Sequence, residues 1–243
     1  MYKTKEIATL VGVHPNTVRV YEDWSFISPV PRQENGYRVY SDIHLFQLKV
    51  ARKLFRCEII QGNLRNRARE IVYACGKEDF KMAEELTLNY LYNLENQYAH
   101  AISATKVVEK WLREEITVSK RTYSRKEVAL LLDTTSESIR SWERNGLITI
   151  PRLENGYRSY GGKELDRLRV IRSLRSAHYS INAILRLLNQ IHQPSSDVVV
   201  ILNTPTDGED IVSVADQLSK SLLNAIADVK ETLVLFYQNA TSH

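Results

Sequence analysis

Two ten-residue stretches carry side chains that suit contact with a charged partner. They are residues 31–40, with the sequence PRQENGYRVY, and residues 151–160, with the sequence PRLENGYRSY. Eight of the ten positions match, so the two stretches are copies of one internal repeat. Each holds two arginines, two tyrosines and one acidic residue, a composition that suits contact with the phosphates of a nucleic acid.

An Asn-Gly pair lies at the centre of each stretch, between residues that suit extended backbone. This pair is the strongest short-range signal for a tight hairpin turn. We therefore predict one basic, aromatic hairpin in each half of the chain. The alternative is a hairpin that only covers a core with its tyrosines, and the residues before each hairpin decide between the two.

The length and composition favour a globular protein of two domains. A chain of 243 residues allows one or two domains, and the repeat predicts two. The content of 43% hydrophobic and 26% charged residues is typical of a globular chain. The apolar runs are too short for a membrane span, and the N-terminal residues do not resemble a signal peptide. With Cys57 and Cys75 as its only cysteines, we expect a cytoplasmic protein without a membrane partner.

The net charge of +4 is unevenly distributed along the chain. Residues 1–58 carry +3 and residues 121–194 carry +6, whereas residues 59–120 are neutral and residues 195–243 carry −5. The positive charge therefore lies in the two repeated segments, where an anionic partner would be met.

The residues before the first hairpin predict two short helices joined by a tight turn. Residues 4–10 suit a first helix, and Gly12 supplies a turn where the backbone needs positive φ. His14 and Pro15 open a second helix that runs to Glu22, because proline is tolerated at a first helical position. Such a pair is a helix-turn-helix, whose second helix can enter a DNA major groove.

The second half repeats this pattern at an offset of about 121 residues. Residues 123–129 restate the opening of the chain, and Asp133 takes the place of Gly12, since Asp tolerates left-handed backbone. Thr135 is a good N-cap for a recognition helix over 136–144, and Gly146 suits the end of that helix.

A helix-turn-helix, then Glu-Asn-Gly-Tyr-Arg-x-Tyr, then Ser41-Asp42 opening a further helix, resembles the N-terminal domain of the MerR family of bacterial transcription regulators. The resemblance covers residues 1–75 and 121–190 well, and the long helices after them only by position. One departure is Ser25, where the family usually has a glycine closing the recognition helix. A non-glycine residue at positive φ costs roughly 1 kcal/mol, so we expect the local turn to differ there.

The resemblance implies that the second helix of each module reads the major groove and that the hairpin, or wing, contacts phosphates and the neighbouring minor groove. In the first half these contacts fall to Asn16, Thr17, Arg19, Tyr21, Arg32, Tyr37 and Arg38. In the second half they fall to Ser136, Ser138, Arg140, Trp142, Arg152, Tyr157 and Arg158. Glu137 stands where the first half has Asn16, and an acid there can accept a hydrogen bond from cytosine but repels the DNA backbone. The two halves are therefore not expected to read the same DNA sequence.

We expect a mainly α fold with two winged helix-turn-helix domains, each followed by a long coiled-coil-type helix. The expected parts are a first winged domain, a long pairing helix, a second winged domain, and a loop with a C-terminal pairing helix, at residues 1–75, 76–117, 121–192 and 193–243. The first long helix needs a partner because it spans about 50 Å at about 1.5 Å per residue. The C-terminal helix is the candidate partner.

Members of the MerR family are homodimers held by an antiparallel pair of such helices. By that resemblance, this chain is expected to build a pseudo-dimer from one polypeptide, with a homodimer of four modules left open. The partners implied are double-stranded DNA and RNA polymerase at a promoter, with a small-molecule effector left open. We expect half-sites roughly one or two helical turns apart, and a promoter that is either distorted or occluded.

Two further segments carry expectations of their own. Residues 194–212 predict a loop around a short apolar stretch, which is either one strand or a tucked segment. The helix after the second wing places its leucines in a core, with four arginines expected on its outside, namely Arg167, Arg169, Arg172 and Arg175.

Catalysis finds little support, and we expect neither an enzyme nor a cofactor. The six histidines are scattered, and the sequence holds no glycine-rich phosphate loop or paired metal-ligand motif. Cys57 and Cys75 lie 18 residues apart without companions at ligand spacing, which favours buried structural thiols over a metal site.

The competing interpretation is a protein that sequesters a small molecule and has degenerate DNA-binding modules. In that interpretation an apolar pocket would be lined by aromatic residues of the first long helix, namely Tyr90, Tyr92, Tyr98 and Trp111. Aromatic residues at helical spacing are more often core. A protein freed from DNA binding would have little physical reason to keep the wing arginines and tyrosines in both halves.

Overall fold

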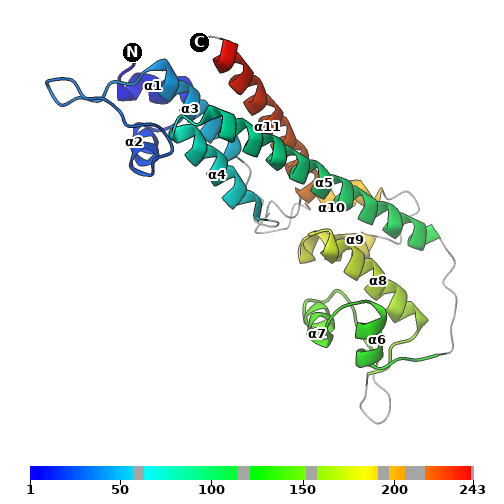
Figure 1. Cartoon of the computed structure of the whole chain (residues 1–243). Coiled ribbons are helices and arrows are strands. Elements are labelled where there is room, and N and C mark those ends of the chain that lie inside the picture. The colour runs from blue at the N-terminus through cyan, green and yellow to red at the C-terminus, as the bar shows by residue number, and fades with distance from the viewer. Residues whose placement is uncertain (57–62, 114–120, 152–157, 191–196, 206–216, 242–243) are drawn as a thin grey trace. The chain divides into compact units, whose positions relative to one another are not determined.

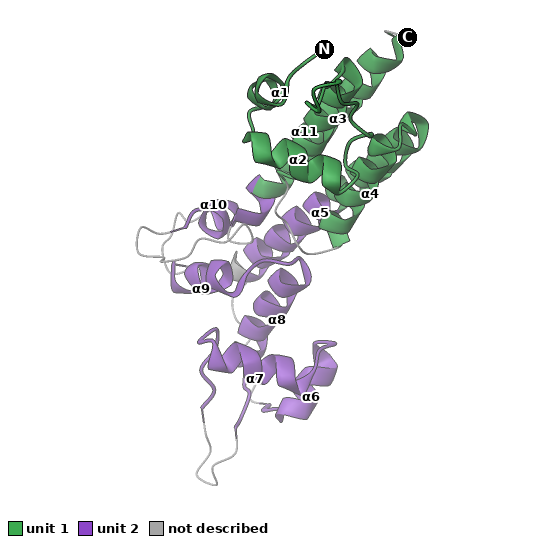
Figure 2. Cartoon of the chain, turned by 90° about the vertical axis from the view of Figure 1, so that its left-hand side faces the viewer, with its two compact units in different colours: residues 1–96, 221–243 green, residues 97–220 purple. Residues whose placement is uncertain are grey.

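The computed structural model describes residues 1–56, 63–113, 121–151, 158–190, 197–205 and 217–241. In this part of the chain the regular elements are helices (Figure 1), which confirms the predicted mainly α class. The chain divides into two compact units, coloured separately in Figure 2. Unit 1 is residues 1–96 with 221–243, and unit 2 is residues 97–220. No helix in the described ranges is long and apolar enough to cross a membrane.

Each unit contains one copy of the repeat. Unit 1 holds α1 (Thr4–Val11), α2 (Pro15–Asp23), α3 (Asp42–Leu54), α4 (Leu64–Gly76), the first part of α5 (Phe80–Arg113) and most of α11 (Leu218–Thr241). Unit 2 holds the rest of α5, then α6 (Arg125–Leu131), α7 (Ser136–Arg144), α8 (Gly162–Ser176), α9 (Ile181–Gln190) and α10 (Val198–Asn203). The sequence predicts four parts with other boundaries than these two units, and that division stays a proposal.

The core of each module is formed by matching apolar residues of the two copies. In unit 1 the cluster joins α1, α2, the wing and α3, and its fully buried members include Ile7, Val18, Tyr40 and Leu48. The corresponding residues of unit 2 are equally buried, and they are Val128, Ile139, Tyr160 and Leu168. In both units the start of the module pairs with the end of the wing, through Tyr2 with Tyr40 and Tyr123 with Tyr160. The core therefore fixes the same scaffold twice.

The turns on either side of each recognition helix use left-handed backbone. Gly12 has φ +70° and Asp133 has φ +47°, as the repeat predicts. After the recognition helix, Ser25 has φ +57° and Gly146 has φ +75°. The expectation of a different turn at Ser25 is wrong, because both turns are closed by the same pair of backbone hydrogen bonds. These run from Ser25 N to Glu22 O and Phe26 N to Tyr21 O, and from Gly146 N to Glu143 O and Leu147 N to Trp142 O.

The first wing is a hairpin that turns at its Asn-Gly pair. Gly36 has φ +79° and donates to the carbonyl of Gln33 at 2.8 Å, while Gln33 donates to the carbonyl of Tyr37 at 2.9 Å. This is the arrangement of a three-residue hairpin loop, in which the glycine occupies the left-handed position. Lower in the arms, Val39 donates to the carbonyl of Pro31, and Ser159 repeats that bond with Pro151. Among the described residues, the arms of the first wing pair through one isolated bridge, between Arg32 and Arg38, rather than through strands.

In unit 1 the two long helices pack with α3. The ring of Phe46 in α3 lies 5.5 Å from the ring of Phe80 in α5 and 5.4 Å from the ring of Phe236 in α11, centroid to centroid. An ion pair of 3.0 Å joins Lys230 of α11 to Glu95 of α5. Since exposed ion pairs contribute little, the aromatic packing is the stronger of these links. Such contacts are what a pairing of the two long helices requires.

The segment after the second module contains a helix, so the strand interpretation is wrong and the tucked-segment interpretation fits. Helix α10 packs against α9, and it begins at Asp197, whose carboxylate accepts from the backbone N–H groups of Val199 and Val200. At its other end the buried Arg186 of α9 donates to the carbonyls of Ile201 and Leu202 at 2.9 and 3.2 Å. A guanidinium there satisfies carbonyls that the helix end leaves without partners.

Candidate nucleic-acid interface

The recognition helix of unit 1 presents polar side chains on its free face. Asn16 and Arg19 are exposed and Thr17 is partly exposed, while Val18 turns into the core. The helix begins on His14, whose Nδ1 accepts from the backbone N–H of Asn16 at 3.2 Å. Pro15 occupies the first helical position, as predicted from the sequence.

Tyr21 lies in an aromatic cluster rather than on the free face of α2. Its ring is 5.5 Å from that of Phe26 and 5.9 Å from that of Phe55, in edge-to-face geometry. Burial raises the pKa of Tyr21, which is half-buried. The structure therefore gives Tyr21 a packing role, and its contact with DNA stays a prediction.

The recognition helix of unit 2 has the bounds predicted from the sequence, residues 136–144. Thr135 caps it by accepting from the backbone N–H of Ser138 at 3.0 Å. Arg140 is exposed, and Ser136 and Ser138 are partly exposed. Trp142, by contrast, is only 6% exposed. The structure therefore gives the indole of Trp142 a packing role in the core, and its contact with DNA stays a prediction.

The exposed contacts predicted on the first wing lie near its turn. Arg32 is exposed, and the side chain of Tyr37 is 72% exposed, which is unusual for so large a ring. An exposed tyrosine beside an arginine is suited to a nucleic-acid backbone, to which it offers a hydroxyl and an aromatic edge. The corresponding Arg152 and Tyr157 of the second wing lie outside the described residues.

An ion pair joins each wing to the end of its recognition helix. Arg38 Nε lies 2.5 Å from Glu22 Oε2, and Arg158 Nε lies 2.6 Å from Glu143 Oε1. The hydrogen bond with Glu22 raises the pKa of Arg38. Both pairs are partly buried, with the four side chains between 16% and 31% exposed. We call this ion pair the wing latch. Because of the wing latch, Arg38 and Arg158, which are expected to contact DNA, also hold each wing against its recognition helix.

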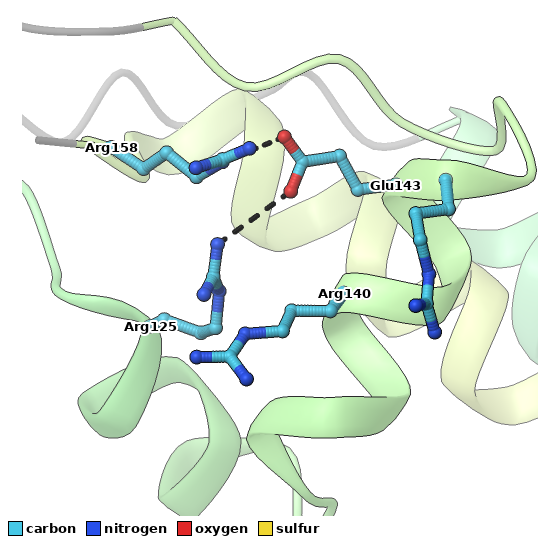
Figure 3. Close-up of a pocket in the computed structure, with 5 residues that line it drawn as sticks. Arg125, Arg140, Glu143 and Arg158 are labelled. Atoms are coloured by element: carbon cyan, nitrogen blue, oxygen red, sulfur yellow. Dashed lines mark hydrogen bonds and ion pairs between the residues drawn. The ribbon is translucent and has the colours of Figure 1, made fainter. Parts of the chain in front are cut away.

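In unit 2 the wing latch is part of a larger group of cations. Arg125, Arg140, Glu143, Arg144 and Arg158 line a cavity of about 520 Å³, which we call the arginine pocket (Figure 3). Arg125 comes from the first turn of α6, Arg158 from the wing, and the other three from α7. Glu143 bonds Arg158 and also lies 3.6 Å from Arg125. Arg125 donates in addition to the hydroxyl of Tyr160 at 3.1 Å.

Sequence reasoning missed Arg125, Arg144 and the two latch glutamates. Glu22 and Glu143 stand at equivalent positions of the repeat, and this match could have indicated from the sequence that they share a role. The prediction that Arg167 and Arg175 lie on the outer face of the helix after the second wing, α8, is wrong in part. Both are half-buried, with Arg167 donating to the carbonyl of Leu147 and Arg175 to that of Tyr179. Burial lowers the pKa of both guanidinium groups.

Comparison with known proteins agrees with this geometry. The family model described as "MerR HTH family regulatory protein" matches residues 2–58 and 123–191, which together are more than half of the chain. The chain belongs to the MerR family. Its two copies of the family domain lie one in each unit.

Relatives of this MerR-family chain are similar to it over about the length of one family domain. The "HTH-type transcriptional regulator CueR" of Salmonella typhi is 38% identical over 76 residues, which are 30% of this chain and 55% of that protein. The protein of the same name from Yersinia pestis is 36% identical over 70 residues, 28% of this chain and 50% of that protein. The chain thus spans about half the length of these curated relatives. No solved structure matches it.

A "Probable heavy metal-dependent transcriptional regulator" of Haemophilus influenzae is also similar, 40% identical over 63 residues, which are 26% of this chain and 49% of that protein. In this MerR-family chain Cys75 is 1% exposed, and burial raises the pKa of its thiol to about 12. Cys57 lies outside the described residues. Among the residues that the structure describes, no group of three or more His, Cys, Asp and Glu side chains is arranged to hold a metal ion.

The aromatic residues of α5 do not share one environment. Tyr90 is buried in unit 1, whereas Tyr92, two residues further on, is 66% exposed. Tyr98 and Trp111 belong to unit 2 and are partly exposed. The arginine pocket and a second cavity beside α7 and α8 of unit 2 are lined by other residues.

Proposed function

We propose that the chain is a sequence-specific, double-stranded DNA-binding transcription regulator whose two modules act as an unlike pair. The observation that carries the proposal is the repeated arrangement of exposed recognition helix, wing and wing latch in both units. A helix with exposed polar side chains beside a basic wing matches the geometry of a protein that places one helix in the major groove. The names of the relatives, all transcriptional regulators rather than enzymes, support the same class.

The two modules present different side chains for base contacts. Asn16 in unit 1 is suited to bidentate contact with adenine. Its counterpart Glu137 pairs with Arg140 and Arg144, at 3.2 and 3.0 Å. An acid held by two arginines can accept from cytosine while its neighbours meet phosphates. We infer that one chain reads two unlike half-sites, as a pseudo-dimer, and acts on a promoter by distorting or occluding it.

The experiment that tests this function is selection of bound fragments from random duplex DNA by the full chain, followed by sequencing. Enrichment of a defined site is the expected result. No binding of duplex DNA, at a salt concentration low enough to permit binding, would overturn the proposal and favour a protein that sequesters a small molecule. Binding without enrichment would limit the function to a DNA-binding protein without sequence preference.

A further inference from the structure

The two modules share a scaffold but differ in charge around the wing latch. The arginine pocket of unit 2 contains four arginines and one glutamate. The equivalent positions of unit 1, read at the repeat offset, hold two arginines, two acids and a hydroxyl, namely Thr4, Arg19, Glu22, Asp23 and Arg38. Two of the replacements change the charge, with Arg125 standing for Thr4 and Arg144 for Asp23. The pocket is therefore strongly cationic in one module only.

The ion pairs of the pocket leave donors for a further anion. Arg125 and Arg158 share Glu143, and Arg140 and Arg144 share Glu137, so among the residues that the structure describes these four guanidinium groups pair with two carboxylates. Each guanidinium has five N–H donors, and these contacts use few of them. Arg140 and Arg144 line the cavity and are 57% and 71% exposed, so their free donors are open to solvent. Several guanidinium groups together suit an oxyanion such as a phosphate, because two of its oxygens can accept hydrogen bonds from one guanidinium group.

In unit 1 the equivalent place is less favourable to an anion. Arg38 is paired with Glu22, and the carboxylate of Asp23 also contributes to raising its pKa. Asp23 is exposed in the last turn of α2, where Arg144 is exposed in the last turn of α7. A phosphate approaching the end of α2 meets a carboxylate, whereas one approaching the end of α7 meets a guanidinium.

We propose that the arginine pocket is a phosphodiester-binding site, which makes the second module the electrostatic anchor of the chain on DNA. The inference rests on the proposed function, since it takes the phosphate to be part of a DNA backbone. The first module then binds with fewer phosphate contacts and depends more on its base contacts. The anchor supplies salt-dependent affinity, and the first module supplies discrimination between sequences.

The test is a charge exchange between the modules. Binding of the full chain to a short duplex of random sequence is measured by fluorescence anisotropy over a series of salt concentrations. Each phosphate contact adds about 0.9 to the slope of log affinity against log salt concentration. Arg144→Asp is expected to lower that slope by about 1 and the affinity at low salt by about tenfold. Asp23→Arg is expected to raise both by a similar amount. The double variant keeps the total charge and is expected to restore the slope.

Controls separate the pocket from net charge and from folding. Arg169→Asp makes the same charge change on the exposed surface of α8, outside the pocket, and is expected to change affinity by less than twofold. Arg144→Gln removes the cation without adding an acid, and about half the effect of Arg144→Asp is expected. Equal losses in Arg144→Asp and Arg169→Asp would overturn the inference alone. A wild-type chain that binds no duplex would overturn the proposed function as well.

Discussion

The two modules have matching cores and a matching wing latch, but they differ in the charged surface residues around the latch. Their cores match position by position, as Val18 with Ile139 and Leu48 with Leu168 illustrate. The latch also matches, because Glu22 and Glu143 hold the wing arginines in the same way. The charged residues around the latch do not match. The comparison indicates that packing fixes the scaffold, while surface charge is free to give each copy a different task.

A second difference concerns how the turn after the recognition helix is supported. In unit 1 the buried amide of Gln47 accepts from Ser28 N at 2.9 Å and donates to the carbonyl of Cys75. Gly76 comes so close to this turn that an added Cβ would lie 2.5 Å from the carbonyl oxygen of Ser25. In unit 2 the matching residue of α8 is Arg167, which donates to the carbonyl of Leu147 at 2.8 Å. An amide and a guanidinium thus support equivalent turns.

The largest effect is expected from the buried aromatic residue of the second recognition helix. Trp142→Ala is expected to lower the free energy of unfolding by about 3 kcal/mol, since it removes a large buried side chain. Tyr21→Ala is expected to cost about 2 kcal/mol, because Tyr21 is only half-buried. Urea denaturation followed by circular dichroism measures both. A stable Trp142→Ala variant that has lost DNA binding would restore the contact role that the burial argues against.

The next effect tests the close approach found at Gly76 in the first module. Gly76→Ala is expected to lower the stability of unit 1 by about 1–3 kcal/mol, because its Cβ meets backbone that must move. The matched control is Lys77→Ala, which alters the adjacent exposed residue and is expected to be nearly neutral. Thermal unfolding compares the two variants. Equal melting temperatures would contradict the described packing of α4 against the turn.

A smaller effect is expected from releasing the wing latch. Glu143→Gln frees two arginines, and Glu22→Gln frees one. We expect Glu143→Gln to raise affinity for random-sequence duplex by about threefold to tenfold and Glu22→Gln by less, because unpaired guanidinium groups gain phosphates. Anisotropy titrations at two salt concentrations measure the change. If both variants weaken binding, the latch glutamates serve mainly to position the wing.

The smallest effect concerns the left-handed residue that ends each recognition helix. Ser25→Gly is expected to raise the free energy of unfolding by about 0.5 kcal/mol, since relief of backbone strain outweighs the added freedom of the unfolded chain. Gly146→Ser is expected to lower it by about 1 kcal/mol. Chemical denaturation of the two variants gives the comparison. A stabilising Gly146→Ser change would contradict the matching of these turns.

Local signals allowed much of the fold to be predicted from the sequence. The cap at Thr135, the proline at Pro15 and the left-handed turn at Asp133 are read from short patterns, and the structure confirms them. The site was predicted less fully. The burial of Trp142 and the inward course of Arg167 depend on contacts between separate elements, which helical spacing alone does not reveal. The arginine pocket likewise joins α6, α7 and the wing, whose residues lie far apart in the sequence.

The central claim is that one chain uses two unlike modules on two unlike half-sites. Footprinting on the selected duplex, with the wild-type chain, Asn16→Ala and Arg140→Ala, tests it most directly. We predict two protected half-sites of different sequence at one chain per duplex. Asn16→Ala should relax base preference in one half-site only, and Arg140→Ala in the other only. A palindromic site occupied by two chains, or both variants acting on the same half-site, would contradict the account.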